Sequence, residues 1–475
     1  MNRITLCIGL ALTVCLLEVE AAVEKPNIVF ILVDDMGWNG LSTAMDPDVK
    51  ESLSDFYKTP HVDQLASESV VFSRAYSPGP SCSPSRAGIL TGKTPAELHM
   101  TTPGAGRSQP WQKVISADFV RVLPETETTI ADRLKKQGYA TAHFGKWHLG
   151  RSNPGQHGFD SHDGSTGNDG GDNTGEGNPK DVFGITSRGL EFMEQQARAR
   201  IPFYLQLSHY AVHEPVAASA SSIKKFGELS VGRRHDDVGF AAMTFDFDTS
   251  VGQVVEKLRE LRLEDSTYLV FMSDNGATGN PRRPNNAPLA FGKGTLYEGG
   301  IRVPLMIRGP GIKGEIYCDE KVTGCDLLPT FCEWAGTAAG DIEGSSLVPL
   351  LTGSPSAFTR PKEGLLFHNP HYGAGPIQKP QTAILVKNYK LLRDLETGTD
   401  QLFDLESDIS ESTDLAQKMP EIAARLAGIL NERLEQVGAN MPTPNPDYDP
   451  GETAPRGGGK GGKGKRGKGK GKGAN

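Results

Sequence analysis

The stretch that decides the fold is NIVFILVDD, residues 27–35. Its continuous apolar and β-branched run predicts a strand buried on both faces, which is typical of a parallel sheet. The runs FYLQL (203–207) and TYLVFM (267–272) repeat this pattern. Helical patterns lie between the strands, at 129–137, 189–198 and 240–261. Strands alternating with helices predict an α/β fold with a large, mainly parallel or mixed sheet flanked by helices.

The sequence changes character from about residue 360. Segments 383–393 and 401–405 predict antiparallel strands with one exposed face, and 421–437 predicts an amphipathic helix. We therefore expect a large N-terminal domain at 22–355 and a smaller C-terminal α+β subdomain with an antiparallel sheet at 356–445.

A basic, glycine-rich tail at 446–475 closes the chain. Residues 456–475 contain eight basic residues, ten glycines and no acidic residue. Such a composition has little to bury, so we expect the tail to be disordered. Two interpretations stay open: a solvated tail without a specific role, or a contact with polyanions through long-range attraction.

The first 21 residues have the features of a signal peptide. A short positive start is followed by the apolar run 4–17 and by small residues suited to cleavage. The run is too short to span a bilayer, and no other stretch is long and apolar enough for a transmembrane segment. We expect a protein that is exported to the periplasm or secreted, for which nucleic acid is not an expected partner.

Cysteine usage excludes a disulfide scaffold. Signal-peptide cleavage would leave Cys82, Cys318, Cys325 and Cys332, whose spacing does not fit a zinc site. The last three could include one disulfide or act as small buried hydrophobic residues. Cys82 could be half of a disulfide, a metal ligand, a nucleophile or a modified residue.

Polar pairs follow two of the predicted strands. Asp34 and Asp35 end the first, and Asp274 and Asn275 follow the strand at 267–272. Ligands bind at the carboxyl edge of open α/β sheets, and three carboxylates with an amide oxygen suit Ca²⁺ or Mg²⁺. The alternative is that these residues only cap turns and helices.

A second group of candidates is cationic. Each residue alone could be a solvated side chain, but several of them beside a divalent cation would form a pocket for a tetrahedral dianion. The group consists of Arg86, Lys146, His148, His213 and Lys293.

The window CSPSRAGILTG, residues 82–92, resembles the signature C-x-P-x-R-A-x-x-L-T-G of the type I sulfatases, members of the alkaline phosphatase superfamily. The blocks NIVFILVDD, GKWHLG, TYLVFMSDNG and GKGTLYEGGIRVP resemble further family elements in the same order. The resemblance extends from about residue 25 to 440. It implies an alkaline phosphatase-like fold and a sulfuric ester hydrolase that acts on sulfated carbohydrates.

The resemblance also implies a role for each candidate. Cys82 would be converted by a formylglycine-generating enzyme to Cα-formylglycine, whose hydrate is the nucleophile. Asp34, Asp35, Asp274 and Asn275 match ligands of calcium rather than magnesium. Arg86 matches the residue that steadies the hydrate, Lys146, His213 and Lys293 match sulfate binders, and His148 matches the base. A serine that often follows the GKWHLG block has a candidate in Ser165.

His368 and His371 complete the candidates. They stand in LLFHNPHYGAG, and we expect them to contact a sugar from a glycine-rich rim, with two ordinary surface histidines as the alternative. Two other functions compete with a sulfatase. One is a phosphonate monoester hydrolase or phosphodiesterase of the same superfamily, and the other is a non-catalytic polyanion-binding protein.

Overall fold

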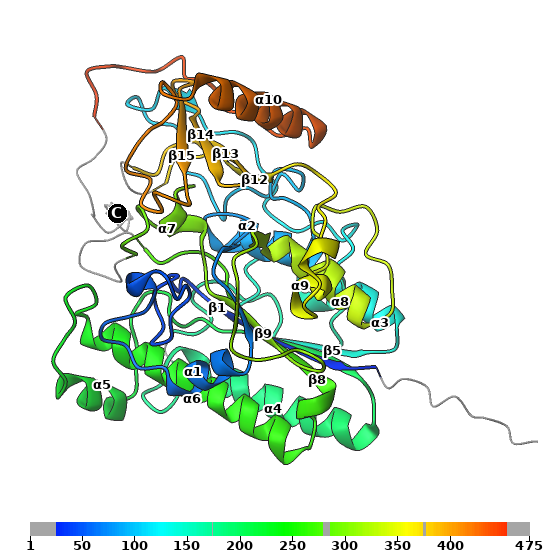
Figure 1. The fold of residues 1–475 in the computed structure, drawn as a ribbon. Coiled ribbons are helices and arrows are strands. Elements are labelled where there is room, and N and C mark those ends of the chain that lie inside the picture. The colour runs from blue at the N-terminus through cyan, green and yellow to red at the C-terminus, as the bar shows by residue number, and fades with distance from the viewer. Residues whose placement is uncertain (1–24, 173, 279–285, 374–376, 454–475) are drawn as a thin grey trace, which may run out of the picture.

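A large mixed sheet lies at the centre of the protein (Figure 1). The computed structural model describes residues 25–172, 174–278, 286–373 and 377–453. Within these residues the sheet has eight strands in the order β10-β2-β9-β8-β1-β7-β5-β6. Its strands are β1 (Asn27–Val33), β2 (Val70–Phe72), β5 (Ala140–Gly145), β6 (Ser161–His162), β7 (Phe203–Ser208), β8 (Thr267–Ser273), β9 (Leu305–Arg308) and β10 (Ile316–Cys318).

Strand β1 occupies the middle of this sheet. It pairs in parallel with β7 on one side and with β8 on the other, and β7 pairs in parallel with β5. Only β9 runs antiparallel to its neighbours β2 and β8. The predicted mainly parallel or mixed sheet is therefore confirmed.

Helices cover both faces of the sheet, as Figure 1 shows. The side chains of Ile28, Phe30 and Leu32 belong to one hydrophobic core, and those of Val29 and Ile31 belong to the other. This double burial explains the unbroken apolar run of β1. The first core includes α2 (Cys82–Thr91), α3 (Ile130–Lys136) and α8 (Leu327–Trp334), and the second includes α1 (Pro60–Ser67), α4 (Val182–Ala199) and α6 (Val238–Glu260).

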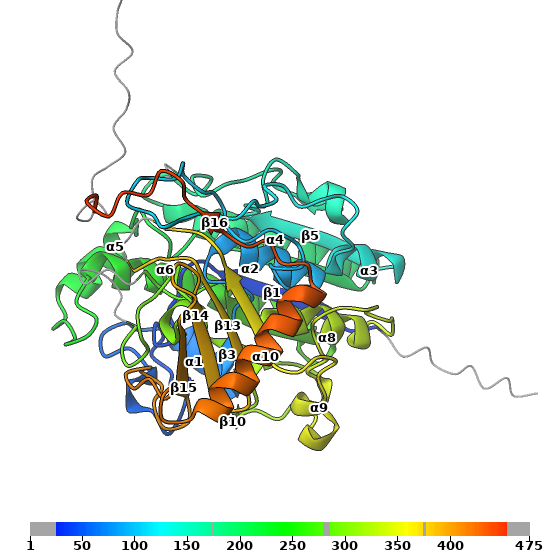
Figure 2. The same ribbon diagram turned by 90° about the horizontal axis from the view of Figure 1, so that it is seen from above.

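A four-stranded antiparallel sheet forms the C-terminal part. Its order is β12 (Leu365–Asn369), β13 (Gln381–Val386), β14 (Tyr389–Asp394) and β15 (Asp400–Asp404). Helix α10 (Pro420–Gln436) lies against it, as the view from above shows (Figure 2). The antiparallel sheet and the amphipathic helix are confirmed.

The prediction that these strands have an exposed face is wrong. Every residue of β13 is buried. Ile384 packs in one core with Leu426 and Leu430 of α10, whereas Ala383 packs in another with Tyr76 and Leu296 of the N-terminal part. The sheet is covered on both faces because it is wedged between α10 and the larger domain. The boundary at 355/356 stays a prediction.

Short elements complete the description. They are β3 (Ala75–Tyr76), β4 (Val114–Ile115), β11 (Val322–Thr323), β16 (Thr443–Pro444), α5 (Ala220–Gly227), α7 (Glu298–Ile301) and α9 (Val348–Leu351), with 3-10 turns at Lys50–Ser52, Pro154–His157, Pro179–Asp181, Glu264–Ser266, Gly324–Asp326 and Pro355–Ala357. The pairing of β16 with β4 returns the chain from α10 to the N-terminal part.

Three further predictions concern the chain termini, membrane-spanning segments and the cysteines other than Cys82. The predicted signal peptide and residues 456–475 of the basic tail lie outside the described residues. No helix in the described part of the chain is long and apolar enough to cross a membrane. Cys318, Cys325 and Cys332 are free thiols, the last two buried, so the disulfide alternative does not hold.

Candidate active site

Four acidic or amide side chains meet at the carboxyl edge of the central sheet. Asp34 and Asp35 follow β1, and Asp274 and Asn275 follow the adjacent parallel strand β8, where Val33 pairs with Ser273. The Nδ2 of Asn275 donates to Oδ1 of Asp35 at 2.7 Å. Single atoms of Asp34, Asp35, Asp274 and Cys82 all lie within 4.8 Å of one another. The predicted convergence at this edge is observed.

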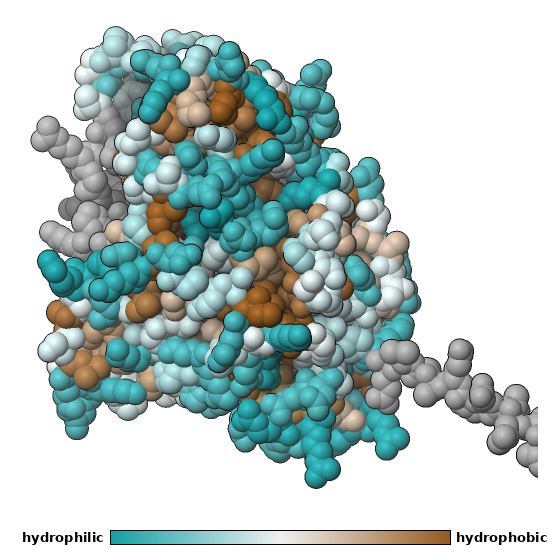
Figure 3. Space-filling view, in the orientation of Figure 1, coloured by the Kyte–Doolittle hydropathy of each residue, from teal (hydrophilic) through white to brown (hydrophobic). Residues whose placement is uncertain are grey.

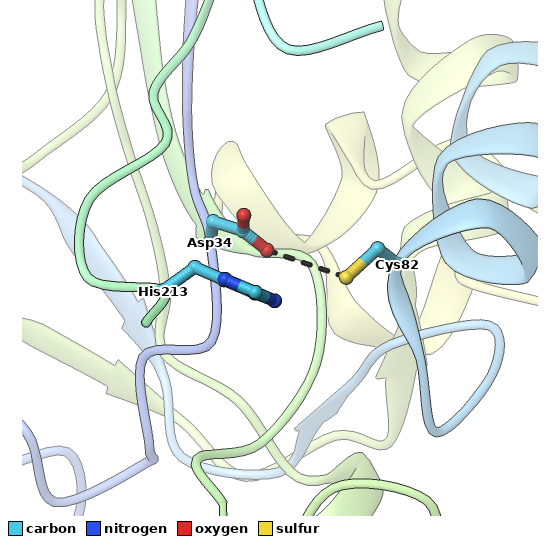
Figure 4. A group of neighbouring side chains, drawn as sticks. All are labelled: Asp34, Cys82 and His213. Carbon is cyan, nitrogen blue, oxygen red and sulfur yellow. Dashed lines mark hydrogen bonds between the residues drawn. The ribbon is translucent and has the colours of Figure 1, made fainter. Parts of the chain in front are cut away.

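Cys82 begins helix α2 and faces this cluster. Its side chain is buried, and Sγ donates a hydrogen bond to Oδ1 of Asp34 at 3.4 Å (Figure 4). Figure 4 also shows the imidazole of His213 directed toward the same space. Gly92 ends the helix with φ 69°, a conformation that favours glycine. The signature window thus makes one short buried helix with Cys82 at its N-terminal end.

Two lysines from distant segments flank the thiol. Lys146, just after β5, places Nζ 3.4 Å from the Cys82 sulfur, and Lys293 places its Nζ at 3.2 Å. Lys146 also pairs with Asp34, and Lys293 pairs with Asp35 at 2.5 Å. The thiol therefore lies between carboxylates on one side and two ammonium groups on the other.

Arg86 holds the site together from the next turn of α2. Its Nε donates to Oδ2 of Asp274 at 2.9 Å, and one terminal nitrogen donates to the carbonyl oxygen of Lys146 at 2.6 Å. The side chain is only 2% exposed, so these charged hydrogen bonds are made away from water. Arg86 thereby links the acidic cluster to the segment that carries Lys146.

The two histidines lie at the border of the cluster. His213 Nδ1 hydrogen-bonds the carbonyl oxygen of Glu214 at 2.5 Å, and Nε2 lies 3.7 Å from Oδ2 of Asp35. His148 has φ 56°, and its Nδ1 is buried without a hydrogen-bond partner among the described residues. Burial and the neighbouring charges of Lys146 and Arg86 lower the pKa of His148 to about 3, so its ring is neutral near pH 7.

Burial and charge also set the protonation of the cluster. Burial raises the pKa of the Cys82 thiol to about 12, and the carboxylate of Asp34 adds to this shift. Burial and Asp34 raise the pKa of Asp274 to about 7. Burial acts to raise the pKa of Asp34 as well, but Lys146, His213 and Arg86 outweigh it and hold this pKa well below its usual value.

The cluster fits a hard divalent cation. Asp34, Asp35, Asp274 and Asn275 offer only oxygen atoms at this position, as calcium prefers. The Oδ1 of Asn275 is buried and has no hydrogen-bond partner within the described part of the chain. Since a buried acceptor without a partner is costly, this oxygen is suited to a ligand.

The rim position predicted for His368 and His371 is wrong. His368 lies on strand β12, and both side chains are 2% exposed. His368 Nε2 bonds the carbonyl oxygen of Asn440 at 2.9 Å, and His371 Nε2 bonds Oγ1 of Thr101 at 2.7 Å. Both are buried because Asn440, in the segment before β16, covers His368, and because Thr101 and Phe119 enclose His371.

The structure also contains a buried charged cluster that the sequence does not predict. Lys390 Nζ pairs with Oε1 of Glu298 at 3.0 Å and with Oε1 of Glu411 at 2.7 Å. Tyr76 donates to the other oxygen of Glu298 at 3.0 Å. Glu298 begins α7, soon after Lys293, so the cluster ties the Lys293 segment to β14. Its members lie far apart in sequence, and although Glu298 stands in the block GKGTLYEGGIRVP, no local pattern shows that Lys390 and Glu411 meet it.

Two family models match the chain. One, described as Sulfatase, covers residues 26–337, and the other, described as N-sulphoglucosamine sulphohydrolase, C-terminal, covers residues 289–439. The first spans the acidic cluster, Cys82 and the cationic residues. The second spans Lys293 and the four-stranded sheet.

Relatives and a solved structure agree with these matches. The N-acetylgalactosamine-6-sulfatase of Canis lupus familiaris is 31% identical over 385 residues, which cover 72% of this chain and 69% of the relative. An ulvan-active sulfatase of Formosa agariphila is 29% identical and covers 87% of this chain and 82% of its own. The crystal structure of Ps i-CgsB with k-i-k-neocarrahexaose shares the fold, with a TM-score of 0.71, 24% identity, and coverage of 86% of this chain and 93% of that one.

Proposed function

This chain belongs to the sulfatase family and is a sulfuric ester hydrolase, and we propose that it is an exported, calcium-dependent enzyme that uses formylglycine at position 82 to desulfate carbohydrates. The observation that carries the proposal is the position of Cys82. Its sulfur lies 3.4 Å from Lys146 Nζ, 3.2 Å from Lys293 Nζ and 3.4 Å from Asp34 Oδ1. Cations and oxygen ligands thus converge on one reactive atom.

Two groups would complete this site. Calcium held by Asp34, Asp35, Asp274 and Asn275 would act as a Lewis acid and as a template for a sulfate oxygen. Formylglycine would supply an aldehyde hydrate in which one hydroxyl attacks sulfur and the other, on losing its proton, expels sulfate and restores the aldehyde. The attacking oxygen would occupy the position that the Cys82 sulfur has in the unmodified chain.

The residues of the chain then bind sulfate and move protons. Lys146 and Lys293 are placed to bind sulfate oxygens and to stabilise the charge that develops on them. His213 is 19% exposed and can donate a proton to the leaving alcohol. His148, neutral and with an unpartnered Nδ1, can accept a proton from the second hydroxyl.

The proposed substrate is a sulfated carbohydrate. Relatives named for N-acetylgalactosamine 6-sulfate and for ulvan support this class, as does the family model named for N-sulphoglucosamine. Maturation would require a formylglycine-generating enzyme, and the signal peptide at 1–21 would direct export. We keep the division at 22–355 and 356–445, with a basic tail at 446–475, as part of this proposal.

Mass spectrometry of the peptide that contains Cys82 tests the modification. The protein is produced with and without a formylglycine-generating enzyme, and Cys318→Ser serves as a control for cysteine chemistry elsewhere. Formylglycine replaces the mass of one sulfur and two hydrogens by that of one oxygen. An active enzyme whose Cys82 is recovered wholly as cysteine would contradict the proposal.

Matched nitrophenyl sulfate and nitrophenyl phosphate test the reaction class. We expect faster release of sulfate, and no release from Cys82→Ala with either ester. Faster release of phosphate would instead favour a phosphoesterase of the same superfamily.

A further inference from the structure

A polar cavity opens beside the candidate active site. It has a volume of about 270 Å³, and its lining includes Ser83, Thr102, Arg121, His148, Arg151 and Ser165. Ser83 follows Cys82 directly, and its Oγ donates to the carbonyl oxygen of His148 at 2.6 Å. A sugar whose sulfate ester is held at Cys82 therefore has this cavity, here called the arginine pocket, next to it.

The charge of the arginine pocket is positive. Arg121 and Arg151 are exposed and both line it, and its lining contains no carboxylate. Within the described residues neither guanidinium forms an ion pair, although many other arginines of the chain do. Two neighbouring like charges without a carboxylate between them attract anions.

Backbone packing brings the two arginines together. Gly150 has φ 78°, and a Cβ at this position would lie 2.3 Å from the carbonyl oxygen of Arg121. Only glycine permits this approach, which places the segment carrying Arg151 against the segment carrying Arg121. Leu123 also donates its backbone N–H to the carbonyl oxygen of Leu149 at 3.3 Å.

The Phe119 ring packs against the guanidinium of Arg121. The guanidinium lies 4.5 Å from the ring centre, and the ring makes an edge contact with His371 at 5.4 Å. His371 is in turn anchored by Thr101, the neighbour of the lining residue Thr102. A cation–π contact restricts an otherwise flexible side chain, so Arg121 is partly preorganised.

We propose that the arginine pocket binds a second anionic group of the substrate, so that the enzyme prefers saccharides carrying a further sulfate or a carboxylate near the scissile sulfate. This inference rests on the proposed function and deepens it. Arginine matches the oxygens of both groups because its planar fork can donate two parallel hydrogen bonds. The hydroxyls of Thr102 and Ser165 can form hydrogen bonds with the sugar hydroxyls that lie between the two anionic groups.

Binding to the inactive Cys82→Ala protein tests the pocket without turnover. Three probes are compared by calorimetry: a monosulfated disaccharide, the same disaccharide with a second sulfate, and the same monosulfated unit linked to a uronic acid. We expect the second anion to tighten binding. Arg121→Gln or Arg151→Gln should raise the Kd for the doubly charged probes by about tenfold, which is the effect expected from the loss of one charged hydrogen bond. Arg198→Gln on α4, distant from the pocket, is the matched control.

Turnover by the active enzyme gives an independent readout. Arg121→Gln should lower kcat/KM for the doubly charged saccharides and leave nitrophenyl sulfate unchanged. A gain with the second sulfate alone, or with the carboxylate alone, identifies the recognised group. Equal binding of all three probes, or equal losses on every substrate, would overturn the inference even if nitrophenyl sulfate is hydrolysed. Failure to release sulfate from any substrate, with the binding difference intact, would count against the proposed reaction only.

Discussion

Lys293 Nζ lies 3.2 Å from the sulfur of Cys82, although 211 positions separate the two residues. Lys293 reaches this place because its segment leads into α7, whose Glu298 is held by Lys390 of the C-terminal sheet. The smaller sheet thus helps to position a cation of the site. Figure 3 shows hydrophilic and hydrophobic side chains interspersed over the outer face that is seen in the orientation of Figure 1.

Lys293→Ala should lower kcat/KM for nitrophenyl sulfate by about 10²–10³, because one donor to the developing sulfate charge is lost. Steady-state kinetics measure the effect, and an unchanged melting temperature shows that folding is intact. Lys224→Ala, an exposed lysine of α5, should have no effect. Equal activity of the two variants would remove Lys293 from the reaction.

Asp274→Asn should lose calcium affinity and activity together, because a hard cation loses one of few charged ligands. Bound calcium is measured after dialysis against metal-free buffer, and activity before and after prolonged chelation. Asp265→Asn, an exposed acid, should behave as wild type. Full activity of Asp274→Asn after chelation would show that the reaction needs no metal.

Lys390→Met should destabilise the protein by about 3–5 kcal/mol, because two buried carboxylates lose their cation. Urea unfolding measures the change, and Lys387→Met, in the exposed turn between β13 and β14, is the control. The double variant Lys390→Met with Glu411→Gln should recover part of the loss. No recovery in the double variant would mean that unpaired charge is not the cause.

His143 should make the protein less stable in acid. Burial lowers the pKa of His143 to about 3, from 6.5 in the unfolded chain. Above pH 6.5 both states are neutral, whereas below it only the unfolded chain takes up a proton. This group should therefore remove roughly 1.4 kcal/mol of stability per pH unit as the pH falls from 6.5 to 3.

The slope of stability against pH is the readout for this histidine. His143→Gln should give a shallower slope over that window, whatever its stability at pH 7. His162→Gln, its exposed partner across β5 and β6, should keep the wild-type slope. Identical slopes for all three proteins would contradict the assignment.

Deletion of residues 456–475 should weaken retention on a sulfated polysaccharide and flatten its dependence on salt, because eight basic residues are lost. Turnover of nitrophenyl sulfate should not change, since the candidate catalytic residues lie elsewhere in the chain. Retention is measured by affinity chromatography over a salt gradient. Equal retention of both proteins at low ionic strength would leave the tail without a tethering role.

The family resemblance assigned the cationic residues around Cys82. The sequence pattern by itself predicted the central strands β1, β7 and β8, the helices α3, α4 and α6, and the acidic cluster that follows β1 and β8. These features depend on local pattern: a run buried on both faces must be apolar throughout, and parallel strands must bring Asp34 and Asp274 to one edge. The signature at 82–92 could be recognised for the same reason, since it forms one continuous helix. Arg151 directly follows the block GKWHLG, so its position beside the site could have been predicted from the sequence, but it was not among the candidates.

Only the tertiary structure decided what covers each surface. The strand pattern of β13 could not reveal that α10 and the larger domain bury both of its faces. The sequence around His371 predicted an exposed position, whereas contacts with Thr101 and Phe119 enclose its side chain. The arginine pocket likewise depends on Gly150 lying against Arg121. Burial and the pairing of charges are set by contacts between segments far apart in sequence, and no local pattern records them.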